Sequence, residues 1–331
     1  MTRAANTRRR ALLQAGAAAG LLGSAAFARA ADASASPTSP SSPLQQLRIG
    51  FQKSAVNLVI VKQQGALEKQ FTDAKVSWIE FPAGPQLLEA LAVGSLDFGL
   101  TGDSPPVFAQ AAGKGLLYVG AEPPKPLSSA ILVKADSPLR TLADLKGKKL
   151  AFQKGSSAHY LSVRAIEKAG LAWSDFTPIY LAPADARAAF EKGAIDAWSI
   201  WDPYYAATEL DLKTRALNTG AGLSNNNSFY LAAREFVGKH PQAIASLLAE
   251  LTRADLFARS NRNEAAQLIA GYSGLSLATV QLFMSRRPTA PTAPLTLAIV
   301  ADQQRVADAF TRLGLIPKPV KVAEIVWQPG A

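Results

Sequence analysis

Short apolar runs of strand length alternate with helical patterns along most of this chain, and this alternation restricts the possible folds more than any other feature. In a first set, strand-like runs lie at residues 47–51, 76–81 and 96–100, followed in turn by helical patterns at 56–71, 85–93 and 105–112. In a second set, strand-like runs lie at 149–152, 178–181, 195–201 and 215–218, with helical patterns at 158–169, 184–192 and 203–210 between them. Such alternation predicts βαβ units and largely parallel sheets, so we expect two α/β units in series.

Two further strand-like runs, at 128–133 and 227–232, lie outside these sets. The chain after the second run is nearly all helical, with apolar residues at helical spacing and no strands of its own. We expect these helices to cover the first unit, which assigns residues 44–130 and 232–331 to a first lobe and 131–231 to a second lobe. The two runs would then form a hinge. A hinge between two α/β lobes creates a central cleft, and ligands bind beyond the carboxyl ends of strands in such sheets.

The first 30 residues are typical of an export signal. Arginines at 8–10 precede an uncharged Ala/Gly/Leu stretch at 15–26, and a cleavage motif of small residues ends at Ala30. We therefore expect cleavage after Ala30 and a periplasmic protein. Paired arginines before a weakly hydrophobic stretch resemble a twin-arginine signal, but the residues that follow them depart from the usual Phe and Lys, so Sec export stays open.

Residues 31–43 are rich in Ser, Pro and Ala, so we expect a disordered linker there. Beyond the leader, no apolar run approaches the roughly eighteen residues that cross a bilayer, and the mature protein is predicted not to be membrane-embedded. The chain carries 35 Lys and Arg against 25 Asp and Glu, but five of the ten excess charges are leader arginines. Because no basic stripe is interleaved with aromatic residues, we expect no nucleic-acid partner.

Residues for catalysis or metal binding are scarce. The chain has no Cys and two His, His159 and His240, and contains neither an HExxH motif nor a phosphate-binding GxxxxGK[ST] loop. Ser156 and Ser157 lie close to His159, but without a GxSxG elbow they favour sharing a ligand over acting as nucleophile and base. We therefore expect no metal, no cofactor and no catalytic activity.

Three strand-to-helix junctions share one design. They are Thr101-Gly102-Asp103 before Ser104-Pro105, Gly155-Ser156-Ser157, and Trp201-Asp202 before Pro203. Each leaves unpaired backbone N–H groups at the positive end of a helix, where an anion is favoured. Taken singly, each junction is also an ordinary helix start. If all three face one cleft, they would form an anion cage that needs no Lys or Arg.

Six segments resemble the periplasmic aliphatic sulfonate-binding proteins of ABC transporters. They are FQK at 51–53, EFPAGPQLLEAL at 80–91, GLTGDSPPVFAQ at 99–110, ADLKGKK at 143–149, KGSSAHYL at 154–161 and DAWSIWDPY at 196–204. The resemblance spans about residues 47–235. It implies a periplasmic binding protein fold of type II, which captures an organosulfonate for sulfur acquisition and delivers it to an ABC permease. It also implies a monomer with one ligand.

The resemblance carries ligand contacts to positions that coincide with the junctions. These are Gln52, Thr101, Gly102, Asp103, Gly155, Ser156, Ser157, His159, Trp201 and Asp202. Ser54-Ala55 replaces a stretch that contains more glycine in the family, and Asp103 stands where Glu is common. Relatives of the same fold bind taurine, nitrate or pyrimidine precursors, so another small anion is an alternative ligand. Two further alternatives are a catalytic relative acting on a heteroaromatic substrate and a receptor that signals to a sensor.

The resulting hypothesis places the sulfonate among backbone N–H groups and the hydroxyls of Thr101, Ser156 and Ser157. Trp201 would cover the alkyl or aryl tail. A sulfonate is ionised at every physiological pH, so fixed neutral donors suffice. Asp103 would then either cap its helix or accept a hydrogen bond from an amine or hydroxyl of the ligand.

Overall fold

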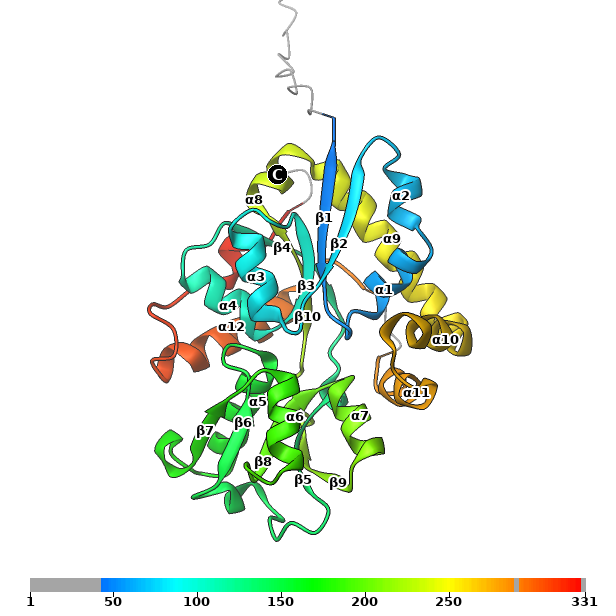
Figure 1. Ribbon diagram of the computed structural model, residues 1–331. Coiled ribbons are helices and arrows are strands. Elements are labelled where there is room, and N and C mark those ends of the chain that lie inside the picture. The colour runs from blue at the N-terminus through cyan, green and yellow to red at the C-terminus, as the bar shows by residue number, and fades with distance from the viewer. Residues whose placement is uncertain (1–42, 289–291, 329–331) are drawn as a thin grey trace, which may run out of the picture. The chain divides into compact units, whose positions relative to one another are not determined.

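The computed structural model describes residues 43–288 and 292–328, which form two five-stranded sheets with helices packed on them (Figure 1). The first sheet has the order β2-β1-β3-β10-β4, and the second has the order β7-β6-β8-β5-β9. The strands are β1 (Gln46–Phe51), β2 (Lys75–Glu80), β3 (Phe98–Gly102), β4 (Leu116–Glu122), β5 (Ser129–Lys134), β6 (Lys149–Phe152), β7 (Thr177–Tyr180), β8 (Ala197–Trp201), β9 (Thr214–Thr219) and β10 (Ser228–Ala233). The α-helices are α1 (Val56–Gln63), α2 (Ala66–Gln70), α3 (Gly84–Ala92), α4 (Ser104–Ala111), α5 (Ser157–Lys168), α6 (Pro183–Glu191), α7 (Tyr204–Asp211), α8 (Arg234–Lys239), α9 (Pro241–Ser260), α10 (Arg262–Ser273), α11 (Leu277–Ser285) and α12 (Leu297–Arg312).

Each sheet combines parallel strands with one antiparallel strand that arrives from the other sheet. β1 pairs in parallel with β2 and β3, and β6 pairs in parallel with β7 and β8. β10 runs antiparallel between β3 and β4, and β5 runs antiparallel between β8 and β9. The chain leaves the first sheet after β4 to enter β5 and returns from β9 to β10. Two connections, residues 123–128 and 220–227, therefore link the two lobes.

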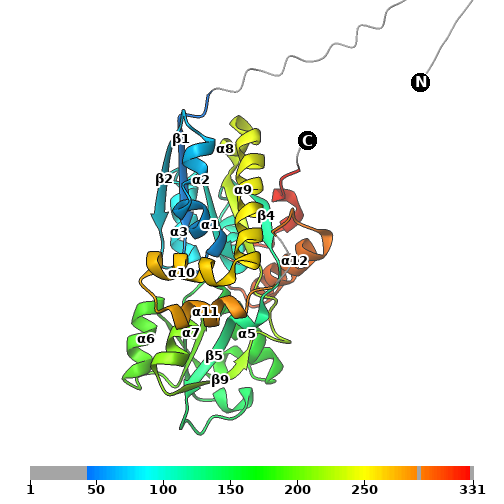
Figure 2. The same ribbon diagram turned by 90° about the vertical axis from the view of Figure 1, so that its right-hand side faces the viewer.

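Helices bury both faces of the first sheet. On one face, Ile49 and Phe98 belong to a buried cluster shared with α1, α9, α10 and α11. On the other face, Leu231 shares a cluster with Leu88 of α3 and Phe310 of α12. Figure 2 shows α9 beside α1, which it contacts along its length. The long helical C-terminal part thus completes the core of the first lobe, and burying each such side chain contributes about 1.5–3 kcal/mol.

The second sheet has its own buried core. Phe152 of β6 and Trp198 of β8 are fully buried and share a cluster with residues of α5, α6 and α7. Every residue of β8 is buried. A strand buried on both faces reads as a continuous apolar run, which is why this segment is visible in the sequence.

The structure differs from the sequence-based expectations in two respects. The helix expected over 56–71 is interrupted at Gly65, whose φ of +58° places it in the left-handed region that glycine adopts most readily. The strand-like runs at 128–133 and 227–232 do not cross between the lobes, because β5 pairs wholly in the second sheet and β10 wholly in the first. The expected lobe boundary after residue 231 therefore falls inside β10, and the linking segments lie before these strands.

The export signal at 1–30 and almost all of the linker at 31–43 lie outside the described residues. Residues 41–331 form one unit that contains both sheets. No helix of the described ranges is both long enough and apolar enough to span a membrane.

Substituting Leu231 tests the first core. Leu231 on β10 is 0% exposed, whereas Val93 at the end of α3 is 74% exposed. We expect Leu231→Ala to lower the free energy of unfolding by about 2–5 kcal/mol, because it removes buried surface and leaves a cavity. Val93→Ala should change it by less than about 0.5 kcal/mol. Urea unfolding followed by circular dichroism measures both, and equal effects of the two substitutions would contradict this assignment of the core.

Candidate functional site

A pocket lies where the carboxyl ends of the parallel strands of both sheets meet. It brings together seven of the sequence-predicted residues: Gln52, Thr101 and Gly102 from the first lobe, and Ser156, Ser157, Trp201 and Asp202 from the second. The pocket encloses a volume of about 40 Å³. A single water needs about 10–15 Å³ of such space, so this pocket has room for one small polar group.

Helix starts from both lobes surround this pocket. Ser54 precedes α1, Gly84 begins α3, Gly102 leads into α4, Ser157 begins α5, and Asp202 leads into α7. The first N–H groups of a helix have no partner within the helix and carry a partial positive charge. The Gln52 side chain is fixed beside them because its Nε2 donates to the Leu100 carbonyl at 3.0 Å. The arrangement favours an anion.

The two lobes touch at Gly102. A Cβ on Gly102 would lie 1.9 Å from the Ser157 Oγ and 3.3 Å from the Ser157 Cβ. The same Ser157 hydroxyl bonds to the Asp103 carboxyl. Glycine at 102 therefore allows the start of α5 to pack directly on the end of β3.

Asp103 lies behind the pocket wall and does not line it. Its side chain accepts hydrogen bonds from the hydroxyls of Ser104 at 2.8 Å and Ser224 at 3.5 Å. Burial raises the pKa of Asp103 to about 6, although its hydrogen bonds with Ser104 and Ser157 oppose this shift. Of the two roles considered from the sequence, this geometry fits a carboxyl held within the protein at the start of α4.

His159 and Gly155 also lie outside the pocket, contrary to the expectation that they contact the ligand. The Gly155 N–H donates to His159 Nδ1 at 3.2 Å, so it is already engaged. The His159 ring is 0% exposed, stacks on Phe152 with centroids 5.0 Å apart and lies 5.1 Å from the ring of Phe310. Burial lowers the pKa of His159 to about 3, so the ring is neutral. His159 packs the two lobes together.

Lys125 and Arg287 line the pocket, although the sequence had suggested a cage without Lys or Arg. Lys125 Nζ donates to Glu122 Oε2 at 3.0 Å and to Ser228 Oγ at 2.7 Å. Both terminal nitrogens of Arg287 lie 3.4 Å from the Glu122 carboxylate. Burial alone would raise the pKa of Glu122, but the charges of Arg287 and Lys125 outweigh it and lower the pKa to about 2. No local sequence signal connects Arg287 to Glu122, because 165 residues separate them.

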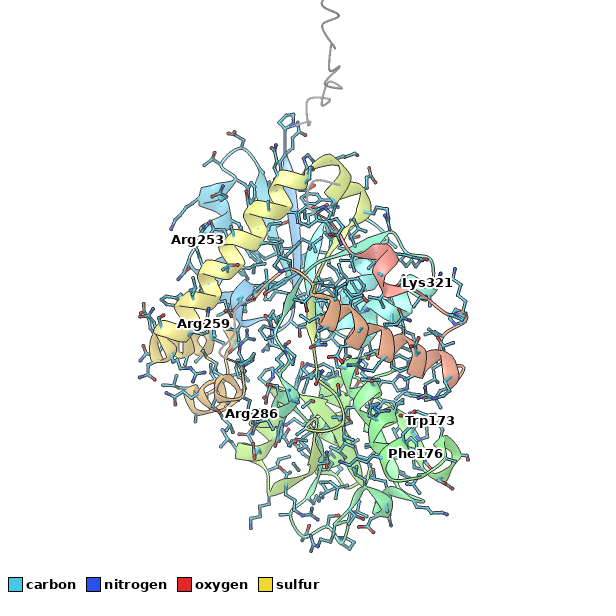
Figure 3. The ribbon with its side chains drawn as sticks, turned by 180° about the vertical axis from the view of Figure 1, so that it is seen from behind. Trp173, Phe176, Arg253, Arg259, Arg286 and Lys321 are labelled. Atoms are coloured by element: carbon cyan, nitrogen blue, oxygen red, sulfur yellow. The ribbon has the colours of Figure 1, made fainter. Side chains whose placement is uncertain are left out.

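Asp202 joins the second lobe to the end of α11. Its Oδ1 accepts from the Ala206 N–H and from Arg286 Nη1, both at 3.0 Å. Figure 3 shows Arg286 beside the second lobe, where its guanidinium lies 3.8 Å from the centre of the Tyr205 ring. Burial raises the pKa of Asp202 to about 7, against the opposing charge of Arg286. Trp201, 9% exposed, is the aromatic wall beside it.

The described residues contain no group of three or more His, Cys, Asp or Glu placed to hold a metal ion. The donors around the pocket are instead hydroxyls, amides and cations. Such groups bind oxyanions, and they leave an organic tail to be covered by Trp201, Leu100 and Phe283, which also line the pocket.

Known proteins match nearly the whole chain. The family model described as NMT1/THI5 like matches residues 73–265. An aliphatic sulfonates-binding protein of Escherichia coli (strain K12) is 49% identical over 311 residues, which are 94% of this chain and 95% of that protein.

Solved structures match both lobes. The periplasmic aliphatic sulphonate binding protein SsuA from Escherichia coli has a TM-score of 0.80 and 49% identity over 88% of this chain and 93% of its own. The alkanesulfonate-binding protein SsuA from Xanthomonas axonopodis pv. citri, bound to MOPS, has a TM-score of 0.82 and 49% identity over 85% and 98%. The predicted fold of two α/β lobes is confirmed.

A double-mutant cycle tests the contact between the lobes. Gly102→Ala forces Ser157 to turn away from Asp103, because the new Cβ occupies the position of the Ser157 hydroxyl. We expect a loss of about 1–3 kcal/mol in the free energy of unfolding. In a Ser157→Ala background the same change should cost at least about 0.5 kcal/mol less. Equal costs in the two backgrounds would mean that the residues do not touch.

The pH dependence of stability tests the environment of Asp103. A carboxyl whose folded pKa is raised to about 6 from 3.8 destabilises the native state as pH rises from about 4 to about 6. Relative to Asp103→Asn, the wild-type protein should therefore lose about 3 kcal/mol across this window. Chemical unfolding at several pH values gives the difference, and a flat difference curve would contradict the buried position.

Proposed function

This chain belongs to the aliphatic sulfonate-binding proteins within the NMT1/THI5-like family, and from that premise we propose that it captures an aliphatic or aryl sulfonate in the pocket between its lobes. It delivers the sulfonate to the permease of an ABC importer, which supplies sulfur to the cell. It is a binding protein and not an enzyme.

The observation that carries this proposal is the set of helix starts and hydroxyls that both lobes direct at one small pocket. A sulfonate has three acceptor oxygens and a permanent single charge, so converging N–H and O–H donors bind it without any proton transfer. Thr101 and Gly102 would contact the sulfonate from the first lobe, and Ser156 and Ser157 from the second. Gln52 would complete the donor set.

Trp201 and Asp202 form the other side of the proposed binding site. The Trp201 ring is held edge-on to Tyr204, with centroids 6.1 Å apart, and would cover the first carbons of the tail. Asp202 would fix the wall through Arg286. A pocket of about 40 Å³ encloses the head group alone, so a longer tail requires the lobes to separate further or the tail to leave the pocket.

We place the mature protein in the periplasm, as in the relatives, after removal of the leader at Ala30. It would act as a monomer that binds one ligand. Mass spectrometry of the exported protein would give the first mature residue, and light scattering its oligomeric state.

Calorimetric titration of the protein from residue 31 onward tests the function. We expect butanesulfonate and hexanesulfonate to bind with a stoichiometry of one, and sulfate and nitrate to bind at least about 100-fold more weakly. Heat with nitrate but with no sulfonate would move the protein to another anion.

The proposed role of Trp201 predicts a dependence on tail length. Trp201→Ala should weaken hexanesulfonate by about tenfold, because the covering aromatic surface is lost, and methanesulfonate by less than about threefold. Trp327→Ala is the matched control, since Trp327 packs at the C-terminal edge of the first lobe, where its N–H donates to the Tyr118 carbonyl. A uniform loss for both ligands would contradict the assignment of Trp201 to the tail.

A further inference from the structure

Three buried charged residues meet at the point where the lobes are connected. Glu122 ends β4, Lys125 lies in the first connection, and Arg287 follows α11. Glu122 is 1% exposed and Lys125 is 8% exposed, and the Arg287 side chain is 12% exposed. Lys125 also bonds to Ser228, where the second connection enters β10. This charge triad therefore joins both connections to the C-terminal helices.

The triad carries one excess positive charge. Glu122 accepts from Lys125, from both terminal nitrogens of Arg287 and from the Tyr230 hydroxyl at 3.1 Å, so one carboxylate serves two cations. The two nearest further carboxylates have cations of their own. Asp255 pairs with Arg259 at 3.1 Å, and Asp202 pairs with Arg286 at 3.0 Å.

The excess charge faces the pocket. Lys125 and Arg287 both line it, whereas Glu122 lies behind them. An ammonium has three N–H donors, and Lys125 uses two on Glu122 and Ser228 within the described part of the chain. The third N–H and the guanidinium of Arg287 provide charged donors in addition to the neutral ones.

A buried charge that has no counter-charge is unfavourable, because little water is present to solvate it. One excess positive charge is balanced by a monoanion. A dianion in the same pocket would leave one negative charge uncompensated.

Resting on the proposed function, we propose that the triad of Glu122, Lys125 and Arg287 sets the charge of the ligand, so that the pocket selects monoanionic over dianionic oxyanions. Neutral hydrogen-bond donors would accept both kinds of anion. The triad thus makes the protein discriminate an organosulfonate from sulfate by charge, in addition to shape.

Two ligands of similar size test this on the wild-type protein. Butanesulfonate is a monoanion throughout, whereas butyl phosphate changes from monoanion to dianion as its second ionisation, near pH 6, is passed. We expect the affinity for butyl phosphate relative to butanesulfonate to fall at least about tenfold between pH 5 and pH 8. A ratio that stays constant would overturn the inference.

Protein groups also titrate in this range, and the ratio removes their effect. The ionisable side chains that face the triad or the pocket are Asp103, Asp202, Asp255 and Tyr230, with Arg286 and Arg259 as fixed charges. They act on both ligands alike at any one pH. Only the charge of the ligand differs between the two titrations.

Variants of the triad should shift the selectivity in opposite directions. Glu122→Gln raises the excess charge to two, so sulfate should gain at least about tenfold in affinity relative to butanesulfonate. Lys125→Gln removes the excess, so both anions should bind at least about tenfold more weakly. Glu235→Gln is the control, because Glu235 is an exposed carboxylate on α8 paired with Lys239, and should leave the ratio unchanged.

The outcomes separate this inference from the proposed function. Wild-type protein that binds no alkanesulfonate overturns the proposed function. Wild-type protein that binds butanesulfonate with a pH-independent ratio, or a folded Glu122→Gln variant with the wild-type ratio, overturns only the selection by charge. Where loss of the buried carboxylate prevents folding, the wild-type ratio decides alone.

Discussion

The site depends on one geometric constraint: the parallel strands of both sheets end at the same space. In each sheet, the helix that follows a parallel strand begins at that end, so the polar starts of α3, α4, α5 and α7 reach one pocket without any loop of special sequence. The antiparallel strands β5 and β10 make this possible. They carry the chain between the sheets along one wall of the pocket and leave the strand ends uncovered.

Two contacts of different chemistry hold the lobes on either side of the pocket. One is aromatic, with the neutral His159 ring between Phe152 of the second lobe and Phe310 of the first. The other is ionic, with Arg286 bound to Asp202 and Glu209. Separating the aromatic contact exposes apolar surface to water, which is unfavourable at any salt concentration. Separating the ionic contact returns charges to water, which offsets much of the lost attraction. Opening of the lobes is therefore opposed mainly on the aromatic side.

The sequence predicted the parts of the structure that local patterns determine. The strands β3 and β8 and the junctions after them were visible because apolar runs end in Gly, Asp and Pro at helix starts. His159 was misplaced because its neighbourhood in the chain, Gly155 to Ser157, resembles a ligand loop, whereas its neighbours in space, such as Phe310, are distant in sequence. Lys125 and Arg287 were missed for the same reason. A pairing across 165 residues leaves no local pattern, and only the fold brings these charges to Glu122.

Glu122 explains how two cations can lie ready at a pocket between the lobes. Lys125 and Arg287 alone would repel each other, and burial would drive the proton from the lysine, because desolvation is the largest influence lowering its pKa. The carboxylate between them keeps both charged and fixes their positions through the Tyr230 hydroxyl on β10. A second carboxylate would cancel the positive charge altogether. A single buried Glu therefore preserves a preorganised site with a charge of one sign, and the backbone N–H groups of the helix starts then orient the anion that this charge attracts.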